Sequence, residues 1–333
     1  MHKSIIGAAL ALGMCLGTPS AAETFKGETA GAGGPIHTVF VAFSNAARDG
    51  GVDIEVNAGK TLTKSMLSAG KGDIGFYSGV PSLYSLMQGQ KAMYEKIGDA
   101  PEYAANLRSI FGFRAGVYHT IVKGGTGIET WEDLKGKRVF TGPPAGSANR
   151  TAQAIIKISS GLVAGTDYTA VILPWGEGTT AFRDGNVDVM FRPADVGSAL
   201  IQQFGLNAEF RILSIPDEAM SNPDLIELSG NPGRGIHEFP GDVYKGQLTE
   251  GTVRALSFSQ FVGTTNAVSE DVVYAATKAF WENLDEVHAT ANFLKDITLE
   301  TAFVAVNLPL HKGAYRYYKE AGFDVPESII PAQ

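Results

Sequence analysis

The chain has 333 residues, a formal net charge of −8 at pH 7, and 44% hydrophobic and 19% charged residues. This length predicts about two domains, and the composition is that of a folded globular protein rather than a disordered one. The acidic excess argues against nucleic acid and anionic membrane as partners. It does not exclude a small anionic ligand, because a cleft on an acidic protein can be locally positive.

The first 22 residues predict a secretory signal peptide. Lys3 gives a basic start, residues 5–16 are apolar, and residues 20–22 are a small-residue cleavage site that makes Glu23 the new N-terminus. The apolar run is too short to span a membrane. We therefore expect export to a periplasm, with the leader removed near Ala22.

The only cysteine, Cys15, lies inside this leader. It raises the alternative of a lipoprotein, but Met14 before it fits a lipidation site poorly, so we favour a protein released after cleavage. The mature chain then has no disulfide, no thiol nucleophile and no cysteine metal site.

In chain order, loops that contain glycine alternate with strands and helices. A loop at residues 29–35 precedes the first predicted helix, and a loop at residues 57–61 precedes the next, with Thr61 as its N-cap. The predicted strands cover residues 52–56, 73–77, 107–113, 118–122, 169–173, 187–191, 211–214 and 252–264. The predicted helices cover residues 36–47, 62–69, 81–94, 147–161, 197–204, 269–287 and 311–321, with shorter helical segments at 130–136, 179–183 and 299–303. Residues 216–240, rich in proline, glycine and asparagine, predict irregular structure.

The alternation predicts an α/β protein with mainly parallel sheets flanked by helices. Residues 70–76 and 185–191 echo each other, since each has a glycine, two further residues, an aspartate and an apolar strand. Two similar lobes facing each other are the simplest architecture for such a repeat. Ligands of open α/β sheets bind beyond the carboxyl ends of the strands, which places the predicted site in the cleft between the lobes.

The stretch from residue 139 to residue 151 is the most informative one. An apolar strand end runs into a loop with Gly142 and Gly146, and a helix follows at once. Such a unit directs the N–H groups of the helix N-terminus at whatever lies above the strand end, which favours an anion there. Ser147, Asn149 and Thr151 are polar groups of this turn. A tight turn without any ligand is the open alternative.

Several segments resemble the TAXI-type solute receptors, the extracytoplasmic binding proteins of a class of TRAP transporters. The segments are residues 73–76, 133–139, 142–144, 270–274 and 308–318, in this order and after a signal peptide. The resemblance covers essentially the whole mature chain. It implies a two-lobed periplasmic receptor, of the type II-like binding-protein architecture, that closes over a small carboxylate and passes it to a TRAP-type permease.

The cleft positions depart from the family pattern. Ile36 and His37 stand where two tyrosines are usual, and Thr63 stands where an asparagine is usual. Residues 77–80 and 145–148 differ as well, and Arg192 and Asp195 replace an apolar residue and a glycine. These positions select the ligand, so dicarboxylates, glutamate-like amino acids, and aromatic or sulfonated acids all stay open.

The candidate binding residues combine charge, hydroxyls, aromatic walls and bare backbone. Arg192 ends a predicted strand and suits a carboxylate held by two parallel hydrogen bonds; its alternative is a surface pair with Asp195. Lys60 offers a second charge, or is merely solvated. The remaining candidates, each with a structural role as its alternative, are Gly33, Gly34, His37, Thr61, Tyr77, Ser78, Ser147, Asn149, Thr151 and Trp175.

The scattered histidines show no metal-ligand spacing, and no nucleophile motif is present. We therefore predict a binding protein without cofactor or metal, monomeric, and not an enzyme. The alternatives are a receptor that serves a sensor or an ABC-type system and, less favoured, an exported hydrolase or isomerase. The predicted first lobe comprises residues 23–115 and 241–333, and the second residues 116–240. The predicted hinges lie at residues 114–116 and near residues 240–244.

Overall fold

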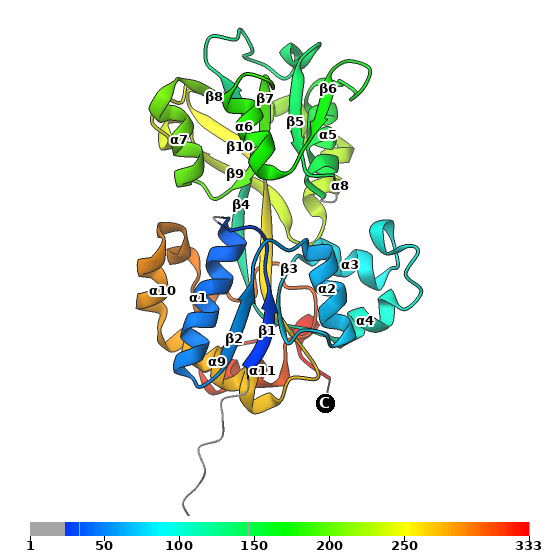
Figure 1. The fold of residues 1–333 in the computed structure, drawn as a ribbon, viewed down its shortest axis with the longest axis vertical. Coiled ribbons are helices and arrows are strands. Elements are labelled where there is room, and N and C mark those ends of the chain that lie inside the picture. The colour runs from blue at the N-terminus through cyan, green and yellow to red at the C-terminus, as the bar shows by residue number, and fades with distance from the viewer. Residues whose placement is uncertain (1–23, 33, 145–146, 333) are drawn as a thin grey trace, which may run out of the picture.

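The computed structural model describes residues 24–32, 34–144 and 147–332 of the chain. The predicted leader, Gly33 and residues 145–146 lie outside them. The described chain forms two lobes, drawn one above the other in Figure 1, and each lobe is a sheet with helices on its faces. The predicted α/β class with two lobes is confirmed.

One sheet runs through both lobes, in the strand order β2-β1-β3-β10-β4-β7-β5-β6, with β9 beside β10 and β8 beside β4. The strands are β1 (Thr24–Glu28), β2 (Asp53–Asn57), β3 (Phe76–Gly79), β4 (Leu107–Lys123), β5 (Arg138–Gly142), β6 (Thr169–Ile172), β7 (Val189–Ala194), β8 (Phe210–Ile212), β9 (Arg234–Pro240) and β10 (Thr252–Thr265). The helices are α1 (Pro35–Asp49), α2 (Leu62–Lys71), α3 (Pro81–Gln88), α4 (Ala100–Asn106), α5 (Ser147–Ser160), α6 (Trp175–Arg183), α7 (Ala199–Asn207), α8 (Pro223–Gly230), α9 (Glu270–Glu282), α10 (Leu284–Thr290) and α11 (Lys312–Glu320).

The two lobes repeat one topology. In the first lobe β1 is central and pairs in parallel with β2 and β3; in the second lobe β5 pairs in parallel with β6 and β7 in the same way. The echo seen in the sequence falls at corresponding places, where α2 leads to β3 and where α6 leads to β7. The sheet as a whole is mixed, because β10 pairs antiparallel with β3, and β4 pairs antiparallel with β7.

Right-handed crossovers fix which helix covers which face. In the second lobe α5 links β5 to β6, and α6 leads back from β6 past β5 to β7, so the two helices cover opposite faces. The cores agree with this: Ile155 of α5 packs in the same apolar cluster as Phe191, whereas Phe182 of α6 packs with Met190, the neighbour of Phe191 on the other face. The same relation holds for α1 and α2 in the first lobe.

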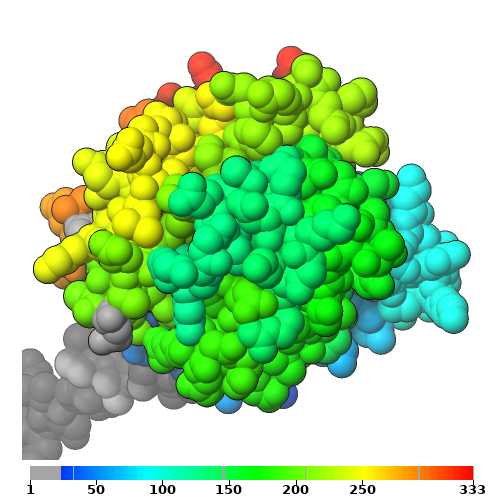
Figure 2. Space-filling model, turned by 90° about the horizontal axis from the view of Figure 1, so that it is seen from above, coloured from blue at the N-terminus to red at the C-terminus, as the bar shows by residue number. Residues whose placement is uncertain are grey.

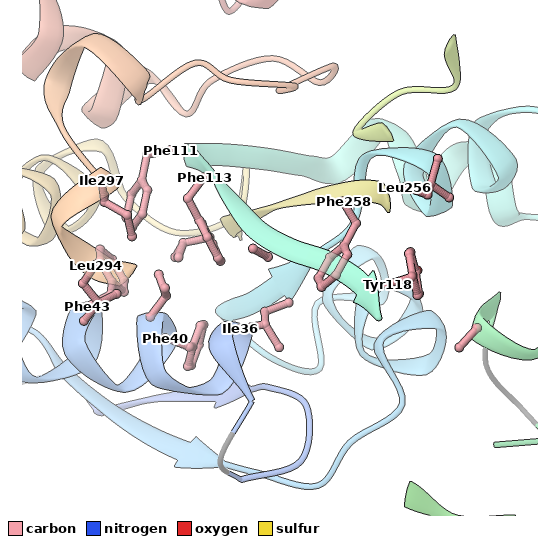
Figure 3. Packing of buried hydrophobic residues seen from close by; sticks show 14 of the residues in the cluster. Ile36, Phe40, Phe43, Phe111, Phe113, Tyr118, Leu256, Phe258, Leu294 and Ile297 are labelled. Atoms are coloured by element: carbon pink, nitrogen blue, oxygen red, sulfur yellow. The ribbon is translucent and has the colours of Figure 1, made fainter. Parts of the chain in front are cut away.

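The first-lobe core is built from stacked aromatic rings. Phe111 of β4 lies parallel to Phe280 of α9 with ring centroids 4.5 Å apart, and Phe43 of α1 packs against both. Figure 3 shows this cluster continuing along β4 and β10 to Tyr118 and Phe258. Burial of each such ring stabilises the fold by about 1.5–3 kcal/mol. The apolar packing thus continues from the first lobe into the second along β4 and β10.

Two long antiparallel strands, β4 and β10, join the lobes (Figure 1). The sequence predicts a break at residues 114–116, but β4 continues through it. Gly116 makes this possible, because its φ is 141° and a Cβ there would lie 2.2 Å from the carbonyl oxygen of Ala194. The pairing with β10 shifts register between Phe258 and Ser259, directly opposite.

The prediction of irregular structure over residues 216–240 is wrong, since α8 and β9 lie there. Asn222 caps α8 by accepting a hydrogen bond from the backbone N–H of Asp224. β9 is held by seven residue pairs with β10, a distant strand that no local pattern identifies. Seen from above, residues of the second lobe fill most of the view, and the cyan segment of the first lobe projects beside them (Figure 2).

Candidate functional site

A cavity of about 510 Å³ lies at the carboxyl ends of the parallel strands of both lobes. The first lobe contributes residues that follow β1, β2 and β3, and the second lobe contributes residues at the ends of β5, β6 and β7. Tyr118 of β4, Arg234 of β9, and Phe258 and Gln260 of β10 complete the lining. This is the position at which open α/β sheets bind small ligands, and the volume suits one.

Another cavity, of about 570 Å³, lies on the second lobe around Trp131 and Leu213, and its lining includes no residue of the parallel strands β5, β6 and β7. Its arginine, Arg211, pairs with Glu129 at 3.6 Å. Because that charge is compensated, this cavity offers less to a charged ligand than the one between the lobes, although it is slightly larger.

Arg192 is the central side chain of the inter-lobe cavity. It stands near the end of β7, and its guanidinium lies over the ring of Trp175, 4.6 Å from the centroid. Its Nε and Nη1 are buried and have no hydrogen-bond partner among the described residues. No described acid, Asp195 included, forms an ion pair with it, and burial lowers the pKa of Arg192 to about 10. A desolvated cation with free N–H groups is a binding element for an anion.

Arg234 is a second arginine in the cavity, and it is not among the site residues predicted from the sequence. Its guanidinium lies over the ring of Tyr118 at 4.9 Å and donates through Nη2 to the Thr151 hydroxyl at 3.4 Å. Its Nη1 is buried without a partner among the described residues. The available signal was an arginine between two glycines, Gly233 and Gly235, which marks a side chain presented where the backbone turns tightly.

The first-lobe wall presents backbone rather than side-chain charge. Gly34 is the N-cap of α1 and has no side chain, and Thr61 is the N-cap of α2 without a side-chain hydrogen bond to the helix. Both helices therefore direct unsatisfied N–H groups and the positive ends of their dipoles toward the cavity. Lys60 lies beside them, about half exposed, with its ammonium group 3.9 Å from Glu28.

The structure brings six of the predicted site residues to the cavity and leaves five outside its lining. The lining includes Gly34, Lys60, Thr61, Ser147, Trp175 and Arg192. Outside it lie His37, Tyr77, Ser78, Asn149 and Thr151. Gly33 is not among the described residues. Whether any of these residues contacts a ligand stays a prediction.

Four of the five residues outside the lining have structural hydrogen-bond partners, and the fifth, His37, is partly buried with an Nδ1 that has no partner among the described residues. Tyr77 is fully buried, donates to the Arg108 carbonyl at 3.5 Å and packs edge-on against Phe261. Ser78 donates to the Thr29 hydroxyl at 2.9 Å. Both residues belong to β3, and every residue of this strand is buried. A position at the end of a strand therefore did not place these side chains in the cleft.

The other three lie on α1 and α5. Asn149 accepts hydrogen bonds from the Thr141 hydroxyl and the Gln153 amide, which fixes the turn between β5 and α5. Thr151 donates to the Ser147 carbonyl and accepts from Arg234, so it positions that arginine. Partial burial lowers the pKa of His37 on α1.

Among the described residues, no group of three or more histidine, cysteine, aspartate or glutamate side chains is placed to hold a metal ion. Within the same part of the chain, each helix is too short or too polar to cross a membrane.

A model of the NMT1-like family matches residues 28–322 of this chain. Solved structures with a similar fold include the alkanesulfonate-binding protein SsuA from Xanthomonas axonopodis pv. citri bound to MOPS, with 14% identity, a TM-score of 0.48, and coverage of 93% of this chain and 87% of that one. The periplasmic aliphatic sulphonate binding protein SsuA from Escherichia coli has 13% identity, a TM-score of 0.47 and coverage of 92% and 95%. The periplasmic ectoine-binding protein of the TeaABC TRAP transporter from Halomonas elongata has 13% identity, a TM-score of 0.43 and coverage of 90% of both chains.

Proposed function

This chain belongs to the NMT1-like family, and we propose that it is an exported solute-binding receptor that captures a small organic anion, a carboxylate, between its lobes. The observation that carries the proposal is Arg192, a buried guanidinium with two unpartnered nitrogen atoms in the inter-lobe cavity. A carboxylate pairs with one edge of the guanidinium, which contains one of these two nitrogen atoms together with Nη2, and it neutralises a charge that the fold has desolvated.

Capture uses both walls. Trp175 fixes the plane of the Arg192 guanidinium, so less side-chain entropy is lost when the carboxylate binds. From the first lobe, the N-termini of α1 and α2 supply N–H donors and a favourable dipole. Closure of the lobes removes water and strengthens each of these interactions.

Closure requires a hinge, and we place it where β4 and β10 run side by side. Gly116 holds a backbone conformation that other residues rarely adopt, and β10 has a register shift opposite, at Phe258 and Ser259. We therefore propose that the second hinge segment lies at Phe258 and Ser259 of β10, and not at residues 240–244 as the sequence suggested. Tyr244 bonds to His119 at 2.8 Å and to the Asp195 carbonyl at 3.1 Å, and this ties it to the second lobe. The lobe boundaries at residues 115 and 116 stay as proposed, and the return point moves to about residue 258.

The finer parts of the proposal rest on the motifs of the sequence. Residues 1–22 are proposed as a leader that exports the chain to the periplasm, and the TAXI-like segments, residues 133–139 and 308–318 among them, favour a TRAP-type permease as the partner that receives the ligand. An ABC-type system or a sensor is the alternative partner. A fused TRAP-type permease encoded beside this protein is expected only for the first.

The proposal is tested by native mass spectrometry of protein expressed in a periplasm, followed by thermal-shift screening of organic acids. We expect a co-purified acid, or a rise in melting temperature with at least one acid of the panel, and a mature chain that begins at Glu23. Absence of a bound mass and of any shift across the panel overturns the receptor proposal. Conversion of a bound acid by the purified protein would instead establish the exported enzyme.

A further inference from the structure

The second arginine of the cavity carries an inference that rests on the proposed receptor function and makes its ligand specific. We infer that the ligand carries two separated anionic groups on an apolar body, one held by Arg192 and the other by Arg234. Four observations support this: the two faces on which the arginines lie, their buried nitrogen atoms without partners, the prolines at the strand ends, and the apolar rings of the lining.

The two guanidinium groups are anchored on opposite faces of the second-lobe sheet. Arg192 alternates with Phe191 along β7, so it shares the face of Met190 and α6, and it rests on Trp175 of α6. Arg234 rests on Tyr118, which stacks on Phe191 at 5.0 Å on the face covered by α5. Each cation is therefore held to its own side of the sheet edge, and the two form separate binding points.

Neither cation is compensated by the protein. Both have buried nitrogen atoms without a hydrogen-bond partner among the described residues, and the described lining contains no aspartate or glutamate. One monovalent anion would leave one of two desolvated charges unpaired. A dianion pairs both.

Three prolines of the second lobe line the same cavity as the two arginines. The cavity is lined by Pro143 after β5, Pro174 after β6 and Pro193 within the last residues of β7. Proline has no backbone N–H, so each of these three strand ends lacks a backbone donor at its proline. Together with the rings of Trp175 and Phe258, they present an apolar surface.

Two arginines and an apolar surface in one cavity fit an aromatic dicarboxylate better than a short dicarboxylate that carries hydroxyl groups. Among the benzene dicarboxylates, terephthalate has its carboxylates farthest apart, and we propose it as the probe for two arginines held on opposite faces. Benzoate has the same body and a single charge. Phthalate has the same body and charge with adjacent carboxylates.

The test measures the dissociation constants of benzoate, phthalate, isophthalate and terephthalate by calorimetry. We expect terephthalate to bind at least about tenfold tighter than benzoate and phthalate, the scale of one added charged hydrogen-bond pair. Arg234→Gln is expected to bring terephthalate to the level of benzoate and to leave benzoate within about twofold. Arg234→Lys, which keeps the charge without the planar fork, is expected to be intermediate. Arg150→Gln, at an exposed position on α5, is the matched control.

The outcomes separate this inference from the function on which it rests. Equal weakening of benzoate and terephthalate by Arg234→Gln would mean that both arginines hold one anion, and the inference would be wrong. Binding of aliphatic monocarboxylates but of no benzene dicarboxylate would also overturn it and would leave the receptor function standing. Failure of every acid to bind would overturn both.

Discussion

The two lobes share one topology and place different chemistry at the same three strand ends. In the first lobe, β1, β2 and β3 lead into residues 30–32 and 34, into residues 59–61 and into Val80, a wall of small residues and helix N-termini. In the second lobe, the corresponding ends of β5, β6 and β7 carry prolines, and the charged groups are the side chains of two arginines, beside Ser147 at the start of α5.

Because of this difference, the two lobes recognise different properties of the ligand. N–H groups at helix N-termini can donate to any small anion, because they recognise negative charge rather than shape. The second-lobe wall adds two arginine side chains to the N-terminus of α5, so the positions of Arg192 and Arg234 decide how many charges the ligand has and how far apart they are. We infer that the first lobe selects an anion and that the second lobe selects which anion.

The largest expected effect comes from removing the central cation of the second-lobe wall. Arg192→Ala is expected to weaken binding of the native acid by about 2–5 kcal/mol, the scale for truncating one side of a buried charged pair. Calorimetry measures it, with Arg150→Ala as the exposed control. Unchanged affinity would remove Arg192 from the site.

The same residue also offers a stability test. A pKa near 10 in place of 12.5 corresponds to roughly 3 kcal/mol of desolvation at 1.36 kcal/mol per unit, of which up to about 2 kcal/mol is offset by contact with Trp175. Arg192→Met is therefore expected to raise the free energy of unfolding of the ligand-free protein by about 1 kcal/mol while binding is lost. A fall in both quantities would mark a structural arginine.

Much of the fold was predictable from the sequence, because both lobes are built from local strand–loop–helix units whose patterns repeat. Half of the cleft was predictable for the same reason, since Gly34, Thr61 and Trp175 follow strand ends directly. Arg234 was not, because it reaches the cavity through β9, which is ordered only by pairing with β10. Tyr77 was predicted to line the cleft but is buried in the core. Its position at a strand end does not show whether its side chain faces the cleft or the core.

The next expected effect is a loss of stability in acid, caused by His119 on β4, the strand that pairs with β7 at Arg192. His119, the neighbour of Arg192 in the β4–β7 ladder, is fully buried, and desolvation lowers its pKa to about 4. As pH falls below the unfolded value of 6.5, the unfolded state takes up the proton first, so stability is lost between pH 6.5 and pH 4 and levels off below. The expected loss is roughly 3 kcal/mol.

His311, the cap of α11 in the first lobe, has a similarly lowered pKa of about 4. His311 therefore allows the same test in the first lobe that His119 allows in the second. Urea unfolding at pH 7 and pH 4 is expected to show a smaller acid loss for His119→Gln and for His311→Gln than for the unsubstituted chain. An acid loss unaltered by both substitutions would show that neither histidine is responsible.

A smaller effect is expected at the platform of Arg192. Trp175→Leu removes the ring face below the guanidinium and the edge contact with Phe140, so binding is expected to weaken by about 1–2 kcal/mol. Trp175→Phe keeps a ring face and is expected to recover most of the affinity. Equal losses in both variants would show that Trp175 acts by filling volume rather than by orienting the guanidinium.

The smallest effect is expected on the first-lobe wall, at its only charged side chain among the described lining residues. Lys60 is about half exposed and already 3.9 Å from Glu28, so its attraction for a ligand is screened by water and shared with a carboxylate. Lys60→Gln is expected to weaken binding by less than about 1 kcal/mol, and by less still in 1 M salt. A loss as large as that of Arg192→Ala, unaffected by salt, would mean that the first lobe also selects its ligand by a fixed side-chain charge. The division between a backbone wall and a side-chain wall would then be wrong.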